Sequence, residues 1–197
     1  MTGCVAAILL AAGRSRRMGS CKQLLPLGDR TVISRCLDAL VTGGVGEVVV
    51  VVSEEGSEVA EAARANPARI VVNPETAGDM ASSVRVGHDA LPAEACGVIV
   101  ALCDYPLVSA ATVTRLIEEH MDSPGSIIIP CHGGRRGHPL LFPRVTLNEL
   151  TSGLILRDLV QHNPERIRCL DVDDPGVLID MDTPEDYHRI CGMFESV

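Results

Sequence analysis

The residues with the clearest chemical potential form a cationic loop near the N-terminus. Small residues at 11 to 13 follow the apolar run 5–10, and three arginines and Lys22 fall within positions 14 to 22. Small side chains let backbone amides approach a phosphate closely, while guanidinium and ammonium groups neutralise it. The spacing fits neither a Walker loop nor the G-x-G-x-x-G dinucleotide fingerprint. We predict a different kind of nucleoside triphosphate site, with these nucleotide-binding candidates: Leu10, Ala11, Ala12, Gly13, Arg14, Arg17 and Lys22.

Aspartates stand at positions typical of metal ligands. Asp104 ends an apolar run, and Asp180 and Asp182 flank Met181, so that alternation places both on one face of an extended chain. Carboxylate oxygens beside a triphosphate suit Mg²⁺. We predict that Asp104 and Asp182 bind Mg²⁺ and that Asp180 supports them. The alternatives are turn capping by Asp104 and helix-dipole complementarity before Thr183.

Two further polar segments are candidates for substrate contacts. Around 73–83, we predict nucleotide contacts from a helix N-terminus, with helix capping by Ser82 or Asp79 as the alternative. The glycine-rich, basic segment 132–139 is predicted to bind a second, anionic substrate, with a surface hairpin as the alternative. The candidates are Asn73, Gly78, Ser82 and Ser83 for the nucleotide, and Arg135, Arg136 and His138 for the second substrate.

Apolar runs alternate with helical patterns along the chain. Continuous apolar runs at 5–10, 48–52, 70–72, 98–102 and 127–129 predict strands that are buried on both faces. Helices are expected over 32–40, from a cap at Ser53 to 66, from a cap at Ser109, and from Thr183-Pro184. This alternation predicts an open α/β sheet, whose carboxyl-end loops would bring all the candidate segments to one cleft.

Composition limits the class of protein. We expect the 197 residues to form a single domain, 1–197, with a core that is almost entirely aliphatic. A net charge of −9 and the scarcity of aromatic residues argue against nucleic acid as a partner. The lack of a membrane-length apolar run and of a signal-peptide pattern predicts a cytoplasmic enzyme without membrane contact. The eight cysteines include no C-x-x-C pair, so we expect mainly buried thiols instead of a zinc site.

The motifs at these positions resemble the molybdenum cofactor nucleotidyltransferases over nearly the whole chain. The resemblance implies a nucleotide-diphospho-sugar transferase-like fold: a Rossmann-like, mostly parallel sheet with one antiparallel late strand and helices on both faces. It implies transfer of CMP from CTP to molybdenum-bound molybdopterin, with release of pyrophosphate. The matching motifs are Leu10-Ala11-Ala12-Gly13 with Arg17-Met18-Gly19 and Lys22-Gln23, Asp104-x-Pro106, Gly137-His138-Pro139, and Asp180-Met181-Asp182-Thr183-Pro184.

This resemblance implies catalytic roles for Lys22 at the α-phosphate, Arg17 at the leaving pyrophosphate and Asp104 at Mg²⁺. Ala12, where guanylyl relatives carry Gly, favours CTP, whereas Cys103 before Asp104 is closer to the guanylyl branch. The alternatives are a guanylyltransferase of the same cofactor and a cytidylyltransferase of a sugar or polyol phosphate such as methylerythritol phosphate. A non-catalytic alternative is a carrier that delivers the cofactor to a molybdenum hydroxylase.

Overall fold

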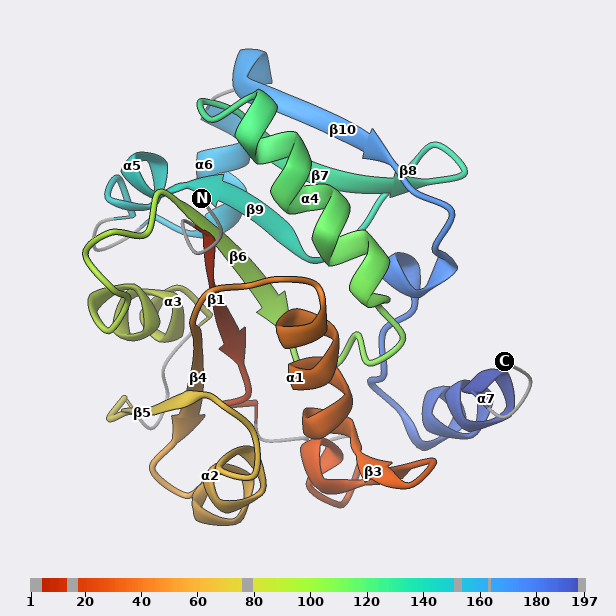
Figure 1. Cartoon of the computed structure of the whole chain (residues 1–197). Coiled ribbons are helices and arrows are strands. Elements are labelled where there is room, and N and C mark those ends of the chain that lie inside the picture. The colour runs from red at the N-terminus through yellow and green to blue at the C-terminus, as the bar shows by residue number, and fades with distance from the viewer. Residues whose placement is uncertain (1–4, 14–17, 76–79, 151–153, 163, 195–197) are drawn as a thin grey trace.

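The computed structural model describes residues 5–13, 18–75, 80–150, 154–162 and 164–194 (Figure 1). Within them, a single α/β domain is built on an eight-stranded sheet of order β10-β7-β9-β6-β1-β4-β5, with β8 paired to β7. The neighbours β6-β1-β4-β5 are all parallel, as are β10 and β7, whereas β9 runs antiparallel to both β6 and β7. The strands are β1 (Val5–Leu10), β4 (Val48–Ser53), β5 (Arg69–Asn73), β6 (Gly97–Leu102), β7 (Ile127–His132), β8 (Arg135–Arg136), β9 (Leu140–Pro143) and β10 (Ile167–Asp171).

Both faces of the central strands are buried, as the continuous apolar runs predict. In β1, Ala7 and Leu9 face one core, while Ala6 and Ile8 face the other. The helices α1 (Val32–Thr42), α2 (Ser57–Ala63) and α4 (Ala110–Asp122) cover the first core. The second core lies under α3 (Met80–Asp89), α5 (Arg144–Leu147) and α6 (Leu156–His162). The predicted doubly covered, mostly parallel sheet is therefore confirmed.

The C-terminal helix α7 (Pro184–Phe194) lies beside the segment that leads into α1 (Figure 1). Its Tyr187 hydroxyl donates to the carbonyl of Pro26 at 2.7 Å, and Phe194 lies under the guanidinium of Arg35. Pro26 belongs to a small hairpin of β2 (Pro26–Leu27) and β3 (Arg30–Thr31), which follows the 3₁₀ helix η1 (Lys22–Leu24). Helix α7 thus contacts the hairpin that follows Lys22 and the first turns of α1.

Most predicted helix starts are confirmed, but one is wrong. Ser109 caps α4 by accepting a hydrogen bond from the amide of Thr112, and α7 begins at Pro184. The predicted helix after Ser53 instead begins at Ser57 with Gly56 as its cap, because β4 extends through Ser53. The periodicity of the sequence predicts no elements between 140 and 178. The short elements found there include the 3₁₀ helices η2 (Pro164–Arg166) and η3 (Pro175–Leu178).

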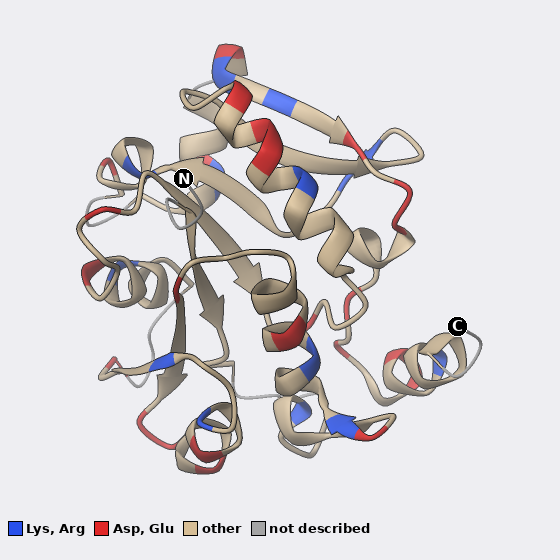
Figure 2. Ribbon diagram, in the orientation of Figure 1, with Lys and Arg blue, Asp and Glu red and all other residues tan. Residues whose placement is uncertain are grey.

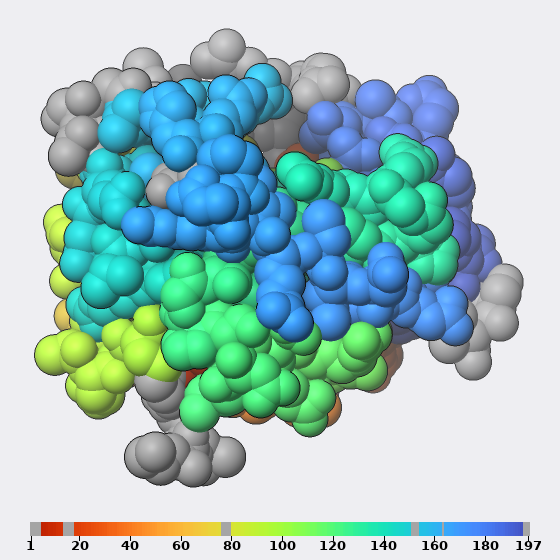
Figure 3. All heavy atoms as spheres, turned by 90° about the horizontal axis from the view of Figure 1, so that it is seen from above, coloured from red at the N-terminus to blue at the C-terminus, as the bar shows by residue number. Residues whose placement is uncertain are grey.

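The surface carries its charges as scattered residues. Figure 2 shows acidic residues along the later turns of α4 and basic residues at several separate places along the ribbon. From above, the segment of β10 and the residues after it runs beside α4 (Figure 3). No helix in the described ranges has the length and apolar character needed to cross a membrane.

The cysteines only partly follow the expectation of thiols. Cys36, Cys103 and Cys131 are buried and free. Cys96 is disulfide-bonded, so the expectation of a thiol is wrong there. Pairing depends on two sulfur atoms being brought together by the fold, and scattered spacing in a sequence does not reveal it.

Candidate active site

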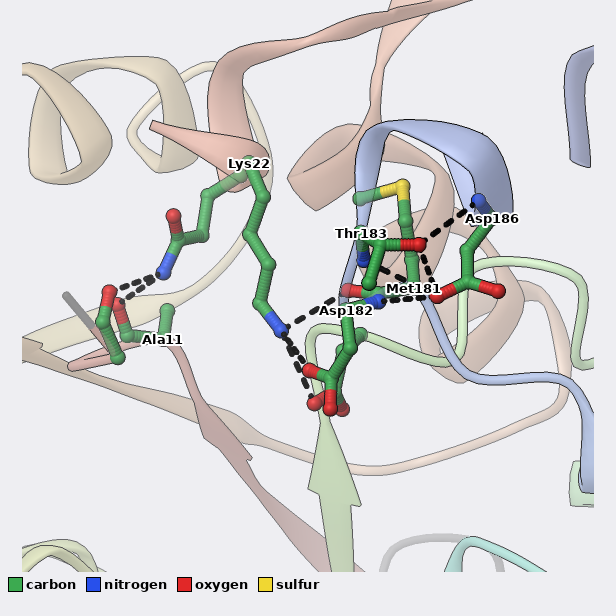
Figure 4. A network of polar contacts seen from close by, with 9 residues as sticks. Ala11, Lys22, Met181, Asp182, Thr183 and Asp186 are labelled. Atoms are coloured by element: carbon green, nitrogen blue, oxygen red, sulfur yellow. Dashed lines mark hydrogen bonds and ion pairs between the residues drawn. The ribbon is translucent and has the colours of Figure 1, made fainter. Parts of the chain in front are cut away.

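Three segments far apart in the sequence meet at the ammonium group of Lys22. Lys22 Nζ donates to Asp104 Oδ2 at 3.1 Å, to Asp182 Oδ1 at 3.1 Å and to the carbonyl of Met181 at 3.0 Å (Figure 4). Lys22 begins η1, Asp104 follows β6, and the other two residues lie between η3 and α7. The expected convergence of these loops at the carboxyl edge of the sheet is therefore observed.

The electrostatic state of Lys22 follows from its surroundings. Burial disfavours its charge, but the ion pairs and hydrogen bonds with Asp104 and Asp182 outweigh burial, so the pKa of Lys22 is raised. Its side chain is only 11% exposed, against 26% for Asp104 and 31% for Asp182. Lys22 is accordingly a permanently charged ammonium group, held against two carboxylates in a partly dehydrated setting.

Backbone contacts hold this cluster in place. The amide of Met181 donates to the carbonyl of Asp104 at 2.9 Å, which joins the end of β6 to the segment before α7. A reciprocal cap then fixes the start of α7: Asp186 Oδ2 accepts from the amide and hydroxyl of Thr183, while the amide of Asp186 donates to Thr183 Oγ1. Asp186 Oδ2 also accepts from the amide of Asp182, so the cap reaches the cluster itself.

Gln23 is a site residue that our sequence reasoning did not select. It is 1% exposed, and its Nε2 donates to the carbonyls of Ala11 at 3.0 Å and Gly13 at 2.9 Å. These bonds tie η1 to the segment that follows β1. A polar residue beside the lysine was visible in the sequence, but only the fold shows that it shapes this segment.

The carboxylates fit a divalent cation. Asp104 Oδ1 is buried and has no hydrogen-bond partner among the described residues, while its other oxygen faces Lys22. A buried carboxylate oxygen without a partner is costly, and a cation would satisfy it. The described residues contain no group of three or more His, Cys, Asp or Glu side chains placed to hold a metal. Two carboxylates with open positions match Mg²⁺, which commonly keeps waters and substrate phosphates as ligands.

Two neighbouring cavities share Met80 and Leu102 in their walls, and the first of them is lined by residues of this cluster. The first, of about 220 Å³, is lined by the segment after β1, by Lys22 and Asp104, and by α3. It contains these predicted nucleotide-binding residues: Leu10, Ala12, Gly13, Lys22, Ser83 and Asp104. Ala11 is buried and lines a separate cavity near α2.

The second cavity, of about 590 Å³, has largely apolar walls and cationic residues at its edge. Arg136 and His138, two of the residues predicted to bind a second substrate, line it. Arg135 is exposed and is absent from the walls of the cavities described. Helix α6 forms a wall that our sequence reasoning missed, through Leu156, Arg157 and Val160.

His138 sits at the junction between this cavity and the carboxylates. Its ring lies 4.8 Å from that of Tyr105, centroid to centroid, and its amide donates to the carbonyl of Val177 at 2.9 Å. Burial lowers the pKa of His138, although the charges of Asp104 and Asp180 oppose this effect. The imidazole is therefore neutral at neutral pH, so the positive charge at this cavity comes from arginines. Burial and the same carboxylates raise the pKa of Tyr105 to about 12.

The predicted residues of β5 and α3 form one polar group. Asn73 is 3% exposed and donates to Ser82 Oγ at 2.9 Å and to Ser83 Oγ at 3.0 Å. Of these three, only Ser83 is in the wall of the 220 Å³ cavity. Asn73 therefore holds Ser83 in place without lining the cavity itself. The predicted residues Arg14, Arg17 and Gly78 lie outside the described ranges.

Relatives of known name cover almost the entire chain. The chain is 33% identical over 199 residues to nicotine blue oxidoreductase of Paenarthrobacter nicotinovorans, covering 95% of this chain and 96% of the relative. It is 24% identical to molybdenum cofactor cytidylyltransferase of Escherichia coli (strain K12), covering 91% and 92%. Proteins with different named activities thus share this sequence pattern.

Solved structures agree with these relatives. A nucleotidyl transferase from Methanothermobacter thermautotroptrophicus superposes with a TM-score of 0.86 at 28% identity, covering 98% of both chains. The manganese complex of Rv0371c from Mycobacterium tuberculosis H37Rv superposes with a TM-score of 0.78 at 27% identity, covering 98% of this chain and 100% of that one. Residues 7–166 match the sequence model of one family, the MobA-like NTP transferase domain. The chain belongs to the MobA-like NTP transferase domain family.

Proposed function

We propose that this protein is a cytidylyltransferase that transfers CMP from CTP to the terminal phosphate of molybdenum-bound molybdopterin. The observation that carries the proposal is the cluster of Lys22, Asp104 and Asp182, of which Lys22 and Asp104 line the 220 Å³ cavity that shares wall residues with the larger, largely apolar one. One cavity would take the triphosphate and base, and the other the pterin. The named cytidylyltransferase relative supports this choice of substrates.

The proposed reaction needs little covalent chemistry from the protein. An oxygen of the acceptor phosphate attacks the α-phosphorus of CTP, one phosphoanhydride bond breaks, and pyrophosphate leaves with the bonding electron pair. Negative charge spreads over the phosphate oxygens, so positioning and electrostatic stabilisation are the main contributions. Lys22 would neutralise the α-phosphate, and Arg17 the pyrophosphate. Neutral His138 would contact the acceptor without acting as a base.

We infer that Asp104 and Asp182 hold a divalent cation during this reaction, with Mg²⁺ as the physiological ion. When bound, that ion supplies positive charge shared between the phosphates of the two substrates. The unpartnered Asp104 Oδ1 supports the assignment, and the manganese complex of a related structure is consistent with it. Lys22 lies between the two carboxylates and pairs with both, so its positive charge reduces their mutual repulsion.

The choice of nucleotide rests on Ala12. Its methyl group narrows the 220 Å³ cavity beside Gly13, where a purine needs more room than a pyrimidine. This favours CTP over GTP. Cys103, the residue closer to the guanylyl branch, also lines this cavity, but its buried thiol interacts with Cys36, and that hydrogen bond and burial raise the pKa of Cys103.

A different class of activity has support from one relative. The similarity to nicotine blue oxidoreductase, together with the largely apolar 590 Å³ cavity, is the observation that favours a redox reaction on a flat organic substrate. Retention of Lys22, Asp104 and Asp182 in one cluster favours phosphate chemistry instead. The two activities differ in one simple respect, since only nucleotidyl transfer releases pyrophosphate.

The test is a pyrophosphate assay with molybdenum-loaded molybdopterin, Mg²⁺ and each of the four ribonucleoside triphosphates in turn. We expect release to be fastest with CTP and to require the acceptor. Faster release with GTP would assign the protein to guanylyl transfer. Release with methylerythritol phosphate but not with molybdopterin would identify methylerythritol phosphate as the acceptor. No release with any triphosphate would contradict the proposal and favour a carrier or an oxidoreductase.

A further inference from the structure

The hydrogen bonds of Asn73 fix the orientation of its buried amide. Asn73 Oδ1 accepts from the backbone amide of Glu75 at 3.0 Å, and Nδ2 donates to Ser82 Oγ and Ser83 Oγ. A backbone N–H can only donate, so the side-chain atom facing Glu75 must be the oxygen. The opposite assignment would place two donors against each other. The two serine hydroxyls therefore face a donor, and each receives a hydrogen bond from Asn73.

This arrangement determines what Ser83 can offer to a ligand. A serine hydroxyl has one hydrogen and two lone pairs. Because one lone pair of Ser83 Oγ accepts from Asn73, its hydrogen must be directed elsewhere. Ser83 is 5% exposed and lines the 220 Å³ cavity. A buried donor left unsatisfied is costly, so a well-bound ligand must bring an acceptor to this point.

We propose that Asn73 is a specificity-determining positioning residue, which keeps the Ser83 hydroxyl available as a donor to the nucleobase. In cytosine the edge opposite the ribose presents an acceptor at N3, whereas uracil presents a donor, N3–H, at the same place. Asn73 and Ser83 together would thus select cytosine over uracil. The inference rests on the proposed function, which supplies the nucleotide, and adds to it the means by which one pyrimidine is distinguished from the other.

The direct test is Asn73→Asp, which changes one donor group into an acceptor at nearly constant shape. The carboxylate can still accept from the amide of Glu75, but it also attracts the hydroxyl hydrogen of Ser83. Only lone pairs of Ser83 then face the cavity. We expect the ratio of the UTP to the CTP dissociation constant, measured by calorimetry with Mg²⁺, to fall about tenfold or more.

Two serine variants keep the test independent of how well Asn73→Asp folds. Ser83→Ala removes the donor itself, so CTP should weaken about tenfold and UTP much less. Ser82→Ala is the matched comparison, since it removes the neighbouring hydroxyl held by the same amide but absent from the cavity wall. We expect it to change the ratio by less than about threefold. Thermal melting of each variant reports on folding separately.

The possible outcomes separate this inference from the proposed function. If the unmodified protein binds no nucleoside triphosphate, the proposed function fails. If it binds CTP more tightly than UTP and both Asn73→Asp and Ser83→Ala keep that ratio, the inference is overturned while the function stands. Equal binding of CTP and UTP by the unmodified protein, or an equal weakening of both in Ser83→Ala, would also overturn it.

Discussion

At the active site, one ammonium group and two carboxylates occupy the same small volume. Lys22 pairs with both Asp104 and Asp182 at 3.1 Å, which leaves one negative charge in excess. Partly buried charges are tolerated best when they are paired, so removing Lys22 would leave two uncompensated carboxylates, whereas removing one carboxylate leaves a single ion pair. The same arrangement explains how a divalent cation could bind, because two carboxylates left to themselves repel each other and attract positive charge.

Asp180 and Asp182 can be distinguished by paired substitutions. Asp182→Asn removes a carboxylate that contacts Lys22, and we expect turnover to fall about 10²-fold or more, with a higher Mg²⁺ requirement. Asp180→Asn removes the same charge two residues away, and we expect a loss below about tenfold. Steady-state kinetics over a range of Mg²⁺ concentrations compares the two. A larger loss in Asp180→Asn would identify Asp180 as the ligand instead.

Individual site residues differed in how well the sequence revealed them. Asp104 could be predicted because a charged residue directly after an apolar run lies at the carboxyl edge of a parallel sheet. Lys22 was indicated by the cationic loop after the first apolar run, and Asp182 by its alternation with Asp180. Gln23 could not be predicted, because its importance comes from two carbonyls that the fold places beside it. Leu156, on α6, has an ordinary apolar pattern, and only tertiary contacts show that it faces a cavity.

At the scale of secondary structure, the connection between β7 and β9 forms part of the wall of the 590 Å³ cavity. Gly137 packs against the backbone of Val177, where an added Cβ would lie 2.3 Å from the Val177 carbonyl oxygen. This close approach carries His138 onto Tyr105 and into the wall of the 590 Å³ cavity. Packing therefore requires a glycine at this position. Only the end of this connection that contains β8 corresponds to the surface hairpin that was the alternative prediction.

We expect His138→Ala to affect the acceptor and not the nucleotide. The ring lies at the acceptor cavity, whereas the 220 Å³ cavity lacks it. The KM for molybdopterin should rise or kcat should fall, while CTP affinity stays within about threefold, under ~1 kcal/mol. Calorimetric titration of CTP with Mg²⁺, beside steady-state kinetics, measures both. A large loss of CTP affinity with unchanged acceptor kinetics would reassign this connection to the nucleotide.

Helix α4 contains a histidine that should make stability depend on pH. His120 is 1% exposed, packs against Gly97 and Cys96, and has a pKa lowered by burial. Between the unfolded pKa near 6.5 and the lower folded value, the unfolded chain binds a proton more readily. The stability that neutral His120 contributes is therefore lost as pH falls through that window. His138, whose pKa is also lowered by burial, changes stability in the same direction.

The corresponding variant is His120→Gln. We expect its melting temperature to fall less steeply from pH 7 to pH 5 than that of the unmodified protein, whatever its stability at pH 7. The exposed His188→Gln is the matched control and should keep the original slope. Equal slopes in all three proteins would show that His120 does not couple folding to pH.

Long buried elements were easier to predict than short ones. The runs that became β1, β4 and β6 are continuous and apolar, so their burial and parallel pairing follow from the residues. The strand β9 has four residues and ends in proline, and β10 is an edge strand in which only Leu170 is buried. Neither has a distinctive pattern. The antiparallel strand was expected only from the family resemblance, and the structure confirms it in β9.

At the scale of the whole molecule, the fold brings the beginning, middle and end of the chain to one edge of the sheet. Lys22, Asp104 and Asp182 come from segments separated by 82 and 160 positions relative to the lysine. The contact of α7 with the β2–β3 hairpin closes this arrangement from the outside. The cluster thus exists only in the completed fold, and two of its residues line the 220 Å³ cavity.

The central claim, that this cluster is a metal-assisted nucleotidyl-transfer centre, is tested most directly by Mn²⁺ binding. Electron paramagnetic resonance follows free Mn²⁺ in the presence of CTP for the unmodified protein, for Asp104→Asn and for the control Asp38→Asn, whose carboxylate pairs with Arg30. We predict Mn²⁺ binding that Asp104→Asn weakens about tenfold or more and Asp38→Asn leaves unchanged. Equal Mn²⁺ affinity in all three proteins would contradict the account.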